Sequence, residues 1–355
     1  MGRERLTKSF YNEEENPLGK DRVTIRDVAA RAGVSHQTVS RVINDSERVL
    51  PETRAKVMEA IAELGYHPNA LARSMARGRS HTVACIAPNL TDYTFASLIS
   101  GAEIEARKHG YFWLSASAAD SDTFAELVSE LVTSRRVEGL MVINPYADDR
   151  QHHLPEDFPL AFAGARPREG ETNSVALDDV NAAYEATKHL LTLGHRQIGM
   201  ITGPMGEDAA QDRCLGYEKA LQEYGISSAD ELIVKGDWMP RSGYDSLMHL
   251  AQAGQMPGAI FAQNDLMAAG ILRATRDLGL DLPRDLSVIG IDDIPLAPFL
   301  APPLTTLHQD FLLIGREAAR LLIRSVKEPD APRRQLRLPV ELIVRRSTAV
   351  AENGN

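Results

Sequence analysis

From residue 82 onward, short apolar segments alternate with longer segments of helical periodicity. The plainest apolar segments, each predicted to be a strand, are VACIAPN, YFWLSAS, GLMVI, LAFAG, QIGMITG, GAIFAQND and LSVIGIDD. Helices are predicted between several of them, over residues 94–109, 122–136, 179–193 and 264–279. This alternation is typical of parallel sheets with helices on both faces, and the length suits two sheets of about 100–150 residues each. We therefore expect an α/β core built from two sheets.

Residues 22–79 have a different pattern, that of three short helices around one small core. Thr24 is a suitable N-cap for the first helix, and Ser35 for the second, HQTVSRVI. Pro51 suits the first position of the third helix. Apolar residues repeat at helical spacing in all three helices and are predicted to form the core: Val28, Ala29, Ala32, Val39, Val42, Ile43, Val57, Ala60, Ile61 and Leu64.

The second helix of this segment carries polar side chains on the face opposite its apolar residues. In a helix-turn-helix, the recognition helix places such side chains in the major groove, where Gln bonds adenine and Arg bonds guanine. His36, Gln37 and Arg41 are therefore the candidate base readers. Two short amphipathic helices joined by a turn also occur in helical domains that do not bind DNA, so this pattern alone leaves both alternatives open.

The continuation GYHPNALARSMARGR favours DNA binding, because it is typical neither of a linker nor of a core. Arg73 and Arg77 supply charge for phosphates, and Leu71 and Met75 lie beside them on one face. An apolar side chain next to arginines is what a minor-groove wedge requires. The predicted DNA-binding residues are Thr24, Ser35, His36, Gln37, Thr38, Ser40, Arg41, Asn44, Thr53, Asn69, Leu71, Ala72, Arg73, Met75 and Arg77.

Charge is unevenly distributed along the chain. Residues 20–81 hold 11 Lys and Arg against 7 Asp and Glu, a net charge of +4, and the whole chain has −10, which leaves −14 elsewhere. The two cysteines, Cys85 and Cys214, are expected to be free, buried thiols, and the N-terminus has no signal-peptide pattern, so a cytoplasmic, nucleoid-associated protein is expected. No apolar run approaches the roughly 18 residues that span a bilayer, and we expect no membrane association.

Residues 22–348 resemble the LacI/GalR family of bacterial transcriptional regulators. The resemblance rests on the helix-turn-helix, on YHPNALARSMA, and on the later motifs QDRCLGY, GDW, QND, GIDD and HQDF. It implies an α/β protein with an N-terminal all-α helix-turn-helix headpiece, followed by a two-lobed core like that of periplasmic binding proteins, with parallel sheets flanked by helices. It also implies that YHPNALARSMA is a hinge helix that orders on operator DNA, and that a ligand lies between the lobes.

The domain boundaries follow from the resemblance and the patterns together. They are a disordered arm (1–21), the helix-turn-helix (22–67), a hinge helix and linker (68–81), a core (82–348) with lobe 1 at 82–177 and 309–337 and lobe 2 at 178–308 and 338–348, and a tail (349–355). No leucine heptads follow the last strand, so a homodimer rather than a tetramer is expected.

Three positions depart from the family pattern. Met75 stands where the family has an intercalating leucine, and methionine is also an apolar wedge. Leu50 replaces the usual polar cap of the third helix. Gly164 stands where sugar-responsive relatives often have an aspartate, so that contact is missing or is supplied by Arg166.

Polar side chains follow the predicted strands, at the edge where ligands bind in open α/β sheets. Amides and carboxylates make paired hydrogen bonds to vicinal hydroxyls, and an aromatic ring stacks on a sugar face. From the resemblance we add Arg213, Trp238, Gln309 and Phe311 as effector contacts. The predicted effector-binding residues are Asn89, Asp92, Tyr93, Asn144, Arg213, Trp238, Asn264, Asp292, Gln309 and Phe311. For each strand-end residue, capping of the next helix is an equally good explanation.

Enzymatic patterns are missing from the sequence. Neither Gly-x-Gly-x-x-Gly nor Gly-x-x-x-x-Gly-Lys-Ser/Thr occurs, and we expect no cofactor. The adjacent carboxylates Asp178–Asp179 and Asp292–Asp293 are expected to point apart, and His152–His153 has no third metal ligand at suitable spacing. We predict no catalytic residue and no metal site.

The predicted function is that of a sequence-specific DNA-binding repressor of carbohydrate-utilisation genes, released from a palindromic operator by a small sugar, a galactoside or another glycoside. The alternative within this class is a corepressor-type regulator, whose DNA binding is tightened by a purine or a phosphorylated carrier protein. An exported sugar-binding protein would have no use for residues 22–79, and a sugar kinase explains neither part of the chain.

Overall fold

The computed structural model describes residues 23–43, 48–67, 79–146, 148–164, 166 and 172–351. Its contacts divide the chain into two compact units, one up to Arg79 and one from Ser80. The expected arm at 1–21 and residues 68–78 of the expected hinge helix lie outside the described residues. Among the described helices, none has the length and apolar character needed to cross a membrane.

The described part of the first unit contains three helices, and the starts of the first two follow from their capping residues. They are α1 (Ile25–Ala32), α2 (His36–Ile43) and α3 (Pro51–Leu64). Thr24 and Asp27 form a capping box at α1, in which the Asp27 carboxylate accepts the Thr24 N–H at 2.7 Å. The Ser35 hydroxyl accepts the Thr38 N–H at 3.1 Å at α2. α3 begins at Pro51 without a side-chain cap, as the apolar Leu50 predicts.

One apolar cluster holds these helices together. Its buried members come from all three helices: Val28, Ala29, Val39, Val42, Val57 and Ala60. Ile43, Ile61 and Leu64 pack against it and are only partly buried. A small cluster of this kind fixes the helix packing and leaves the outer face of α2 in solvent.

The first lobe of the second unit is a six-stranded sheet in the order β11-β5-β4-β3-β1-β2, and its paired strands run parallel. The strands are β1 (Thr82–Ala87), β2 (Phe112–Ser117), β3 (Gly139–Val142), β4 (Leu160–Ala163), β5 (Asn173–Leu177) and β11 (Gln335–Leu338). The helices are α5 (Tyr93–Lys108), α6 (Ser121–Val128) and α11 (Phe311–Lys327), with the short turns η1 (Ser129–Thr133) and η2 (Asp149–His153). The helix predicted over 122–136 therefore ends earlier and finishes in a π-helical turn.

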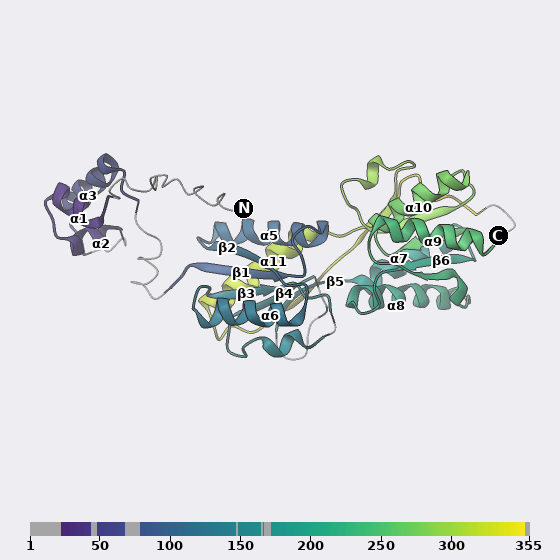
Figure 1. Cartoon of the computed structure of the whole chain (residues 1–355), viewed down its shortest axis with the longest axis horizontal. Coiled ribbons are helices and arrows are strands. Elements are labelled where there is room, and N and C mark those ends of the chain that lie inside the picture. Colours follow the sequence, from purple (N-terminus) through teal and green to yellow (C-terminus); the bar gives the residue numbers. More distant parts are fainter. Residues whose placement is uncertain are drawn as a thin grey trace, which may run out of the picture. The chain divides into compact units, whose positions relative to one another are not determined.

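Helices cover both faces of this sheet (Figure 1). Val83 and Cys85 of β1 pack with α5 and α11, whereas Ala84 and Ile86 pack with α6. A strand buried on both faces reads as a continuous apolar run, which is why β1 was visible in the sequence. α5 and α11 approach closely at Gly101, where a Cβ atom would overlap the backbone of α11.

The second lobe is a six-stranded sheet in the order β12-β10-β9-β8-β6-β7. The strands are β6 (Ile198–Thr202), β7 (Ile233–Lys235), β8 (Ala259–Ala262), β9 (Ser287–Asp292), β10 (Thr305–His308) and β12 (Glu341–Ile343). The helices are α7 (Asp179–Thr192), α8 (Asp208–Glu223), α9 (Pro240–Gln252) and α10 (Asp265–Leu278), with the turns η3 (Asp230–Leu232) and η4 (Ala297–Phe299). The edge strand β12 pairs antiparallel with β10, and the other pairs are parallel.

The described chain passes between the two sheets three times. The passages run from β5 to α7, from β10 to α11 and from β11 to β12, each through a few residues. Because the chain crosses back and forth, neither sheet is formed by one continuous segment (Figure 1). The carboxyl ends of the central strands of both sheets face the region between the lobes, where a cavity lies.

Candidate DNA-binding surface and interlobe cavity

The outer face of α2 presents the predicted base readers to solvent. His36, Gln37 and Arg41 are exposed, and Ser40 is half-buried. Thr38 is also half-buried, and its hydroxyl bonds the Ser35 hydroxyl at 2.9 Å. These exposed side chains are free to turn toward a nucleic-acid groove.

Other predicted DNA-binding residues have local structural roles or are not described. The Thr24 hydroxyl donates to the Asp27 carboxylate at 2.7 Å, so it belongs to the cap of α1. Thr53 is half-buried in the first turn of α3. The predictions for Asn44, Asn69, Leu71, Ala72, Arg73, Met75 and Arg77 lie outside the described residues.

A cavity of ≈ 210 Å³ lies between the two lobes. Lobe 1 contributes residues after β1, β3 and β4, and lobe 2 contributes residues after β6, β7, β8 and β9. Six of the ten predicted effector residues line it: Asn89, Asp92, Arg213, Trp238, Asn264 and Asp292. The rule that strand ends meet at one crevice therefore brings together residues that are far apart in sequence.

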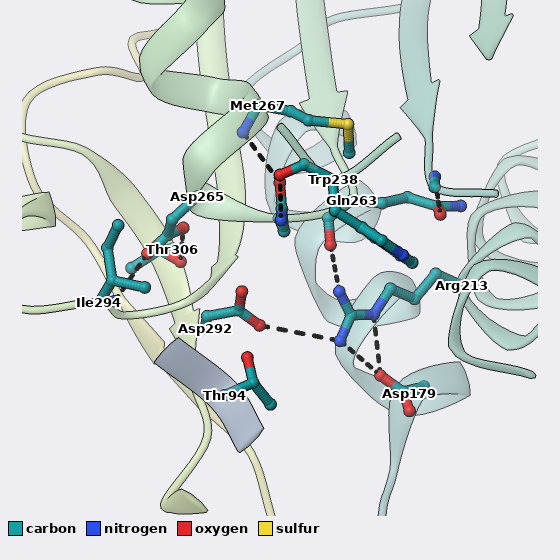
Figure 2. Close-up of polar contacts among 12 residues, drawn as sticks. Thr94, Asp179, Arg213, Trp238, Gln263, Asp265, Met267, Asp292, Ile294 and Thr306 are labelled. Carbon is teal, nitrogen blue, oxygen red and sulfur yellow. Dashed lines mark hydrogen bonds and ion pairs between the residues drawn. The ribbon is translucent and has the colours of Figure 1, made fainter. Parts of the chain in front are cut away.

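Arg213 is the centre of the polar network in lobe 2 (Figure 2). Its Nε and Nη2 atoms each lie 2.8 Å from Asp179 Oδ1, and Nη1 donates to the Gln263 carbonyl. Nη2 also lies 3.8 Å from Asp292 Oδ1. The side chain is 6% exposed, so these contacts are made away from bulk solvent.

Trp238 forms one wall of the cavity. Its indole N–H donates to Glu207 Oε2 at 3.0 Å, and the Arg213 guanidinium carbon lies 5.5 Å from the ring centroid. The ring lies against the backbone at Gly203, where a Cβ atom would overlap it. Trp238 itself has φ 70°, and such left-handed backbone in a non-glycine residue is concentrated at functional sites.

Three of the cavity residues also stabilise local backbone. Asn89 Oδ1 accepts the Asp92 N–H at 2.8 Å, and Asp92 Oδ1 accepts two N–H groups at the start of α5. Asn264 Oδ1 accepts the Met267 N–H at 2.8 Å, and its amide donates to the Trp238 carbonyl at 3.0 Å. Asp92 and Asn264 therefore cap helices while they line the cavity, and Asn89 stabilises the turn before α5.

Burial shifts the titration of several carboxyl groups at the site. It raises the pKa of Asp292 and of Asp179, against the opposing effect of Arg213, and it raises the pKa of Glu207, against the hydrogen bond from Trp238. Beneath the cavity, burial raises the pKa of Asp265 to about 7, although its carboxylate accepts bonds from Thr306 at 2.5 Å and from the Ile294 N–H at 3.0 Å.

Four predicted effector residues do not line the cavity. Phe311 is 3% exposed and packs in the core of lobe 1, edge-on to Tyr93 at 6.2 Å between ring centroids, because it begins the apolar face of α11. Asn144 is buried, and its carbonyl accepts the Tyr146 N–H at 3.1 Å. Gln309 is buried, and its side-chain amide has no hydrogen-bond partner among the described residues. Neither aromatic ring lines the cavity.

Arg166 does not stand in for the aspartate missing at Gly164. It binds Asp212 of α8 with Nε at 2.8 Å and Nη2 at 2.5 Å, and it lies 3.8 Å from Asp208. Its guanidinium is therefore used in an ion pair that joins the two lobes. Gly164 lines the cavity with φ 75°, where a side chain would be strained.

Two acidic residues of the cavity, Glu207 and Asp237, were not predicted from the sequence. Both follow strands of lobe 2, β6 and β7, so the strand-end rule applied to them as well. β7 has only three residues and is partly exposed, which hides it in the sequence. Tyr146 also lines the cavity and forms an antiparallel bridge with Glu207 across the lobes.

The remaining predictions concern metals, acid pairs and cysteines. No group of three His, Cys, Asp or Glu that could hold a metal ion occurs among the residues described. Asp178 caps α7, while Asp179 bonds Arg213, so the two carboxylates have separate roles. Cys85 and Cys214 are both free thiols, but Cys214 is only half-buried, since it lies on α8 near the exposed Met205.

Comparisons with known proteins agree with this arrangement. Residues 24–69 match the family described as bacterial regulatory proteins, lacI family, and residues 187–348 match the periplasmic binding protein-like domain. The chain is 34% identical to the HTH-type transcriptional repressor CytR of Escherichia coli strain K12 over 330 residues, which cover 92% of this chain and 96% of that protein. It is also 34% identical over 332 residues to the HTH-type transcriptional repressor PurR of Haemophilus influenzae strain PittEE, covering 91% of this chain and 98% of that protein.

Two solved structures extend the likeness to the fold. The lac repressor dimer bound to operator and the anti-inducer ONPF superposes with a TM-score of 0.85 at 31% identity, covering 92% of this chain and 99% of that chain. The complex of the transcriptional regulator CelR with cellobiose gives a TM-score of 0.71 at 32% identity, covering 92% and 100%. The chain therefore belongs to the lacI family of bacterial regulatory proteins, and it is a DNA-binding transcriptional repressor rather than an enzyme.

Proposed function

We propose that this repressor binds a palindromic operator as a homodimer and is released when a small sugar enters the interlobe cavity. The observation that carries the proposal is the composition of that cavity. An indole wall at Trp238, a buried Arg213 and the oxygens of Asp92, Asn264 and Asp292 surround a space of ≈ 210 Å³. Stacking against a ring face and paired hydrogen bonds to hydroxyls are the features of a polyol site.

Relatives with known ligands support a carbohydrate of modest size. One similar structure is a complex with cellobiose, and another is bound to the anti-inducer ONPF. The cavity lies between lobes that the chain crosses three times, so a ligand bound there contacts both lobes. Ligand binding is then coupled to the angle between the lobes, a two-state element of the kind that allostery requires.

Exposed apolar side chains of lobe 1 support the dimer. Phe112 of the edge strand β2 is 70% exposed, and Leu114 and Ile104 of β2 and α5 are each 39% exposed. Large apolar side chains gathered on a sheet edge and the neighbouring helix are typical of a protein interface. A twofold dimer would place two copies of α2 on half-sites about one helical turn of DNA apart. A monomer in sedimentation equilibrium at micromolar concentration would exclude this arrangement.

The DNA-binding part of the proposal is tested with an operator selected from random duplex DNA. Arg41→Ala is expected to weaken binding to the selected site by about 1–3 kcal/mol and to have far less effect on random DNA, since Arg41 is proposed to read a base. Arg31→Ala removes the same charge from an arginine already paired with Glu63 at 2.6 Å, and it serves as the matched control. Equal losses on selected and random DNA would assign Arg41 to the phosphates instead.

The effector part is tested by fluorescence anisotropy of the labelled operator in the presence of galactosides, other glycosides and purines. A sugar is expected to lower operator affinity in the wild type, and Asp292→Asn is expected to keep operator binding while losing the response. A ligand that instead tightens operator binding would identify a corepressor. If the Asp292→Asn variant still dissociates from the operator at the sugar concentration that releases the wild type, Asp292 does not contact the effector.

A further inference from the structure

The charges around the interlobe cavity restrict the kind of ligand that it accepts. Four carboxylate side chains line it, those of Asp92, Glu207, Asp237 and Asp292. Among the described lining residues, Arg213 is the only lysine or arginine, and Asp179 holds it at 2.8 Å. The lining therefore has an excess of negative charge, and its one cation is already paired.

Helix N-termini commonly bind anions in α/β proteins, and four helices begin around this cavity, two of them with a side-chain cap. α5 and α10 begin at the cavity. Asp92 accepts the N–H groups of Thr94 and Phe95 in the first turn of α5, and Asn264 accepts that of Met267 in the first turn of α10. α8 begins with the carboxylates of Glu207 and Asp208, and Asp237 accepts a backbone N–H at 2.9 Å just before α9. The starts of α8 and α9 have no side-chain cap, but a carboxylate lies beside each of them, so a phosphate at any of these four helix starts would meet a capping oxygen or a like charge.

The Asp292 side chain independently indicates that the ligand supplies hydrogen-bond donors. It is 7% exposed and lines the cavity, and its carboxylate accepts no hydrogen bond from the described residues; Arg213 Nη2 lies 3.8 Å from its Oδ1. Its backbone has φ 121°, a strained conformation that holds the carboxylate in this position. A buried carboxylate without a donor is costly, and a ligand hydroxyl or N–H would remove that cost.

We propose that the ligand of this cavity carries no phosphate or carboxylate and is bound through its own hydrogen-bond donors, so that an unphosphorylated ligand binds and its phosphate ester is excluded. This inference rests on the proposed function only in taking the cavity as the effector site. It narrows the effector to neutral or cationic compounds rich in hydroxyl or N–H groups. Phosphorylated intermediates of the same compounds would not act on the repressor.

The sign of the cavity charge is measurable without knowing the ligand, because Trp238 forms its wall. Trp113 is replaced by phenylalanine, and the remaining Trp238 fluorescence is quenched at pH 8 by caesium, iodide and uncharged acrylamide, each normalised to N-acetyltryptophanamide. We expect a higher normalised constant for caesium than for iodide at low salt, and convergence of the two as salt screens the charges. Iodide quenching equal to or stronger than caesium quenching would overturn the inference.

A conservative variant links the effect to the lining residues. Asp92→Asn retains a good helix N-cap and removes one charge, so the fold is kept and the caesium-to-iodide ratio should fall. Asp245→Asn removes a carboxylate from the exposed face of α9, where it pairs with Arg241, and should leave the ratio unchanged. An equal change in both variants would mean that the ratio reports the overall charge of the protein, and the inference would fail.

A second experiment compares parent compounds with their phosphate esters in thermal-shift titrations of the full chain. The pairs are glucose with glucose 6-phosphate and adenosine with AMP. In any pair with a binding member, the ester should bind at least about tenfold more weakly, which corresponds to 1.4 kcal/mol. An ester that binds as well as its parent would overturn the charge inference and leave a ligand-responsive repressor. Binding of a parent compound without any change in operator affinity would instead contradict the proposed function and leave the charge inference standing.

Discussion

Arg213→Ala should strongly destabilise the second lobe, because Arg213 holds several of its elements together as well as lining the cavity. Its guanidinium joins α8 to Asp179 at the start of α7, to the Gln263 carbonyl after β8, and to Asp292 at the end of β9. Truncation leaves the buried carboxylates of Asp179 and Asp292 without their cation. Breaking a buried ion pair in this way typically costs about 3–5 kcal/mol.

The assay is urea unfolding followed by Trp238 fluorescence in a Trp113→Phe background, at fixed protein concentration because dimerisation affects stability. Arg213→Ala should lower the free energy of unfolding by about 3–5 kcal/mol at pH 8. Burial raises the pKa of Asp179 and Asp292 above their unfolded values, so their contribution to stability is greatest at low pH and is lost as pH rises. The deficit of the variant should therefore be smaller at pH 5 than at pH 8.

A double-mutant cycle separates the ion pair from simple loss of packing. Arg213→Met combined with Asp179→Asn should recover part of the loss seen in Arg213→Met alone, with a coupling of about 0.5–3 kcal/mol. Arg241→Ala is the matched control, since Arg241 pairs with Asp245 at 2.7 Å on α9 but is 82% exposed, and such pairs contribute about 0.3–0.5 kcal/mol. A loss in Arg213→Ala no larger than in this control would refute the reasoning.

Three smaller perturbations test other parts of the structure. Leu50→Ser supplies the side-chain cap that α3 lacks and should slow hydrogen exchange in its first turn, a gain of about 1 kcal/mol; unchanged exchange would mean that the proline start already suffices. Asp265 has a pKa raised to about 7 in the folded state, so the stability it provides is present below its unfolded value and lost as pH rises through 7. The stability difference between wild type and Asp265→Asn should therefore shrink by roughly 3–4 kcal/mol from pH 4 to pH 8 in urea titrations, and a constant difference would contradict this. Arg166→Asp breaks the ion pair between the lobes and should speed hydrogen exchange at the start of α8, with recovery when Asp212→Arg is added; failure of the swap to recover protection would show that the pair does not hold the lobes.

The two lobes were predictable from sequence because their central strands are buried on both faces. β1, β3, β6, β8 and β9 read as continuous apolar runs and were all identified. Among the strands that were not identified, β7 is short, and β11 and β12 are partly exposed at the sheet edges. β5 and β10 are buried, but their sequences NSVAL and TTLH contain polar residues and do not read as apolar runs. Whether an edge strand runs parallel or antiparallel depends on where the chain returns, and no local pattern in the sequence encodes that for β12.

The site was predictable to the extent that position in the chain determines position in space. The end of a parallel strand is always at the crevice, which located Asn89, Asn264 and Asp292, and the same rule would have located Glu207. It does not determine which way a side chain turns. Phe311 follows β10 at the right place but begins α11, whose apolar face packs into lobe 1. The environment of the helix, which the sequence does not show, decides that orientation.

For the polar residues at strand ends, the sequence left two explanations open, helix capping and ligand binding. The geometry shows that one side chain can cap a helix and line the cavity at the same time. A carboxylate has two oxygens, and Asp92 uses Oδ1 for two N–H groups of α5, while its other oxygen has no hydrogen-bond partner among the described residues. These bonds at the positive end of the helix dipole hold the group in place at the cavity wall. A cap can therefore orient a ligand acceptor without giving up its structural role, and this double use explains why a cavity surrounded by helix starts can be so rich in negative charge.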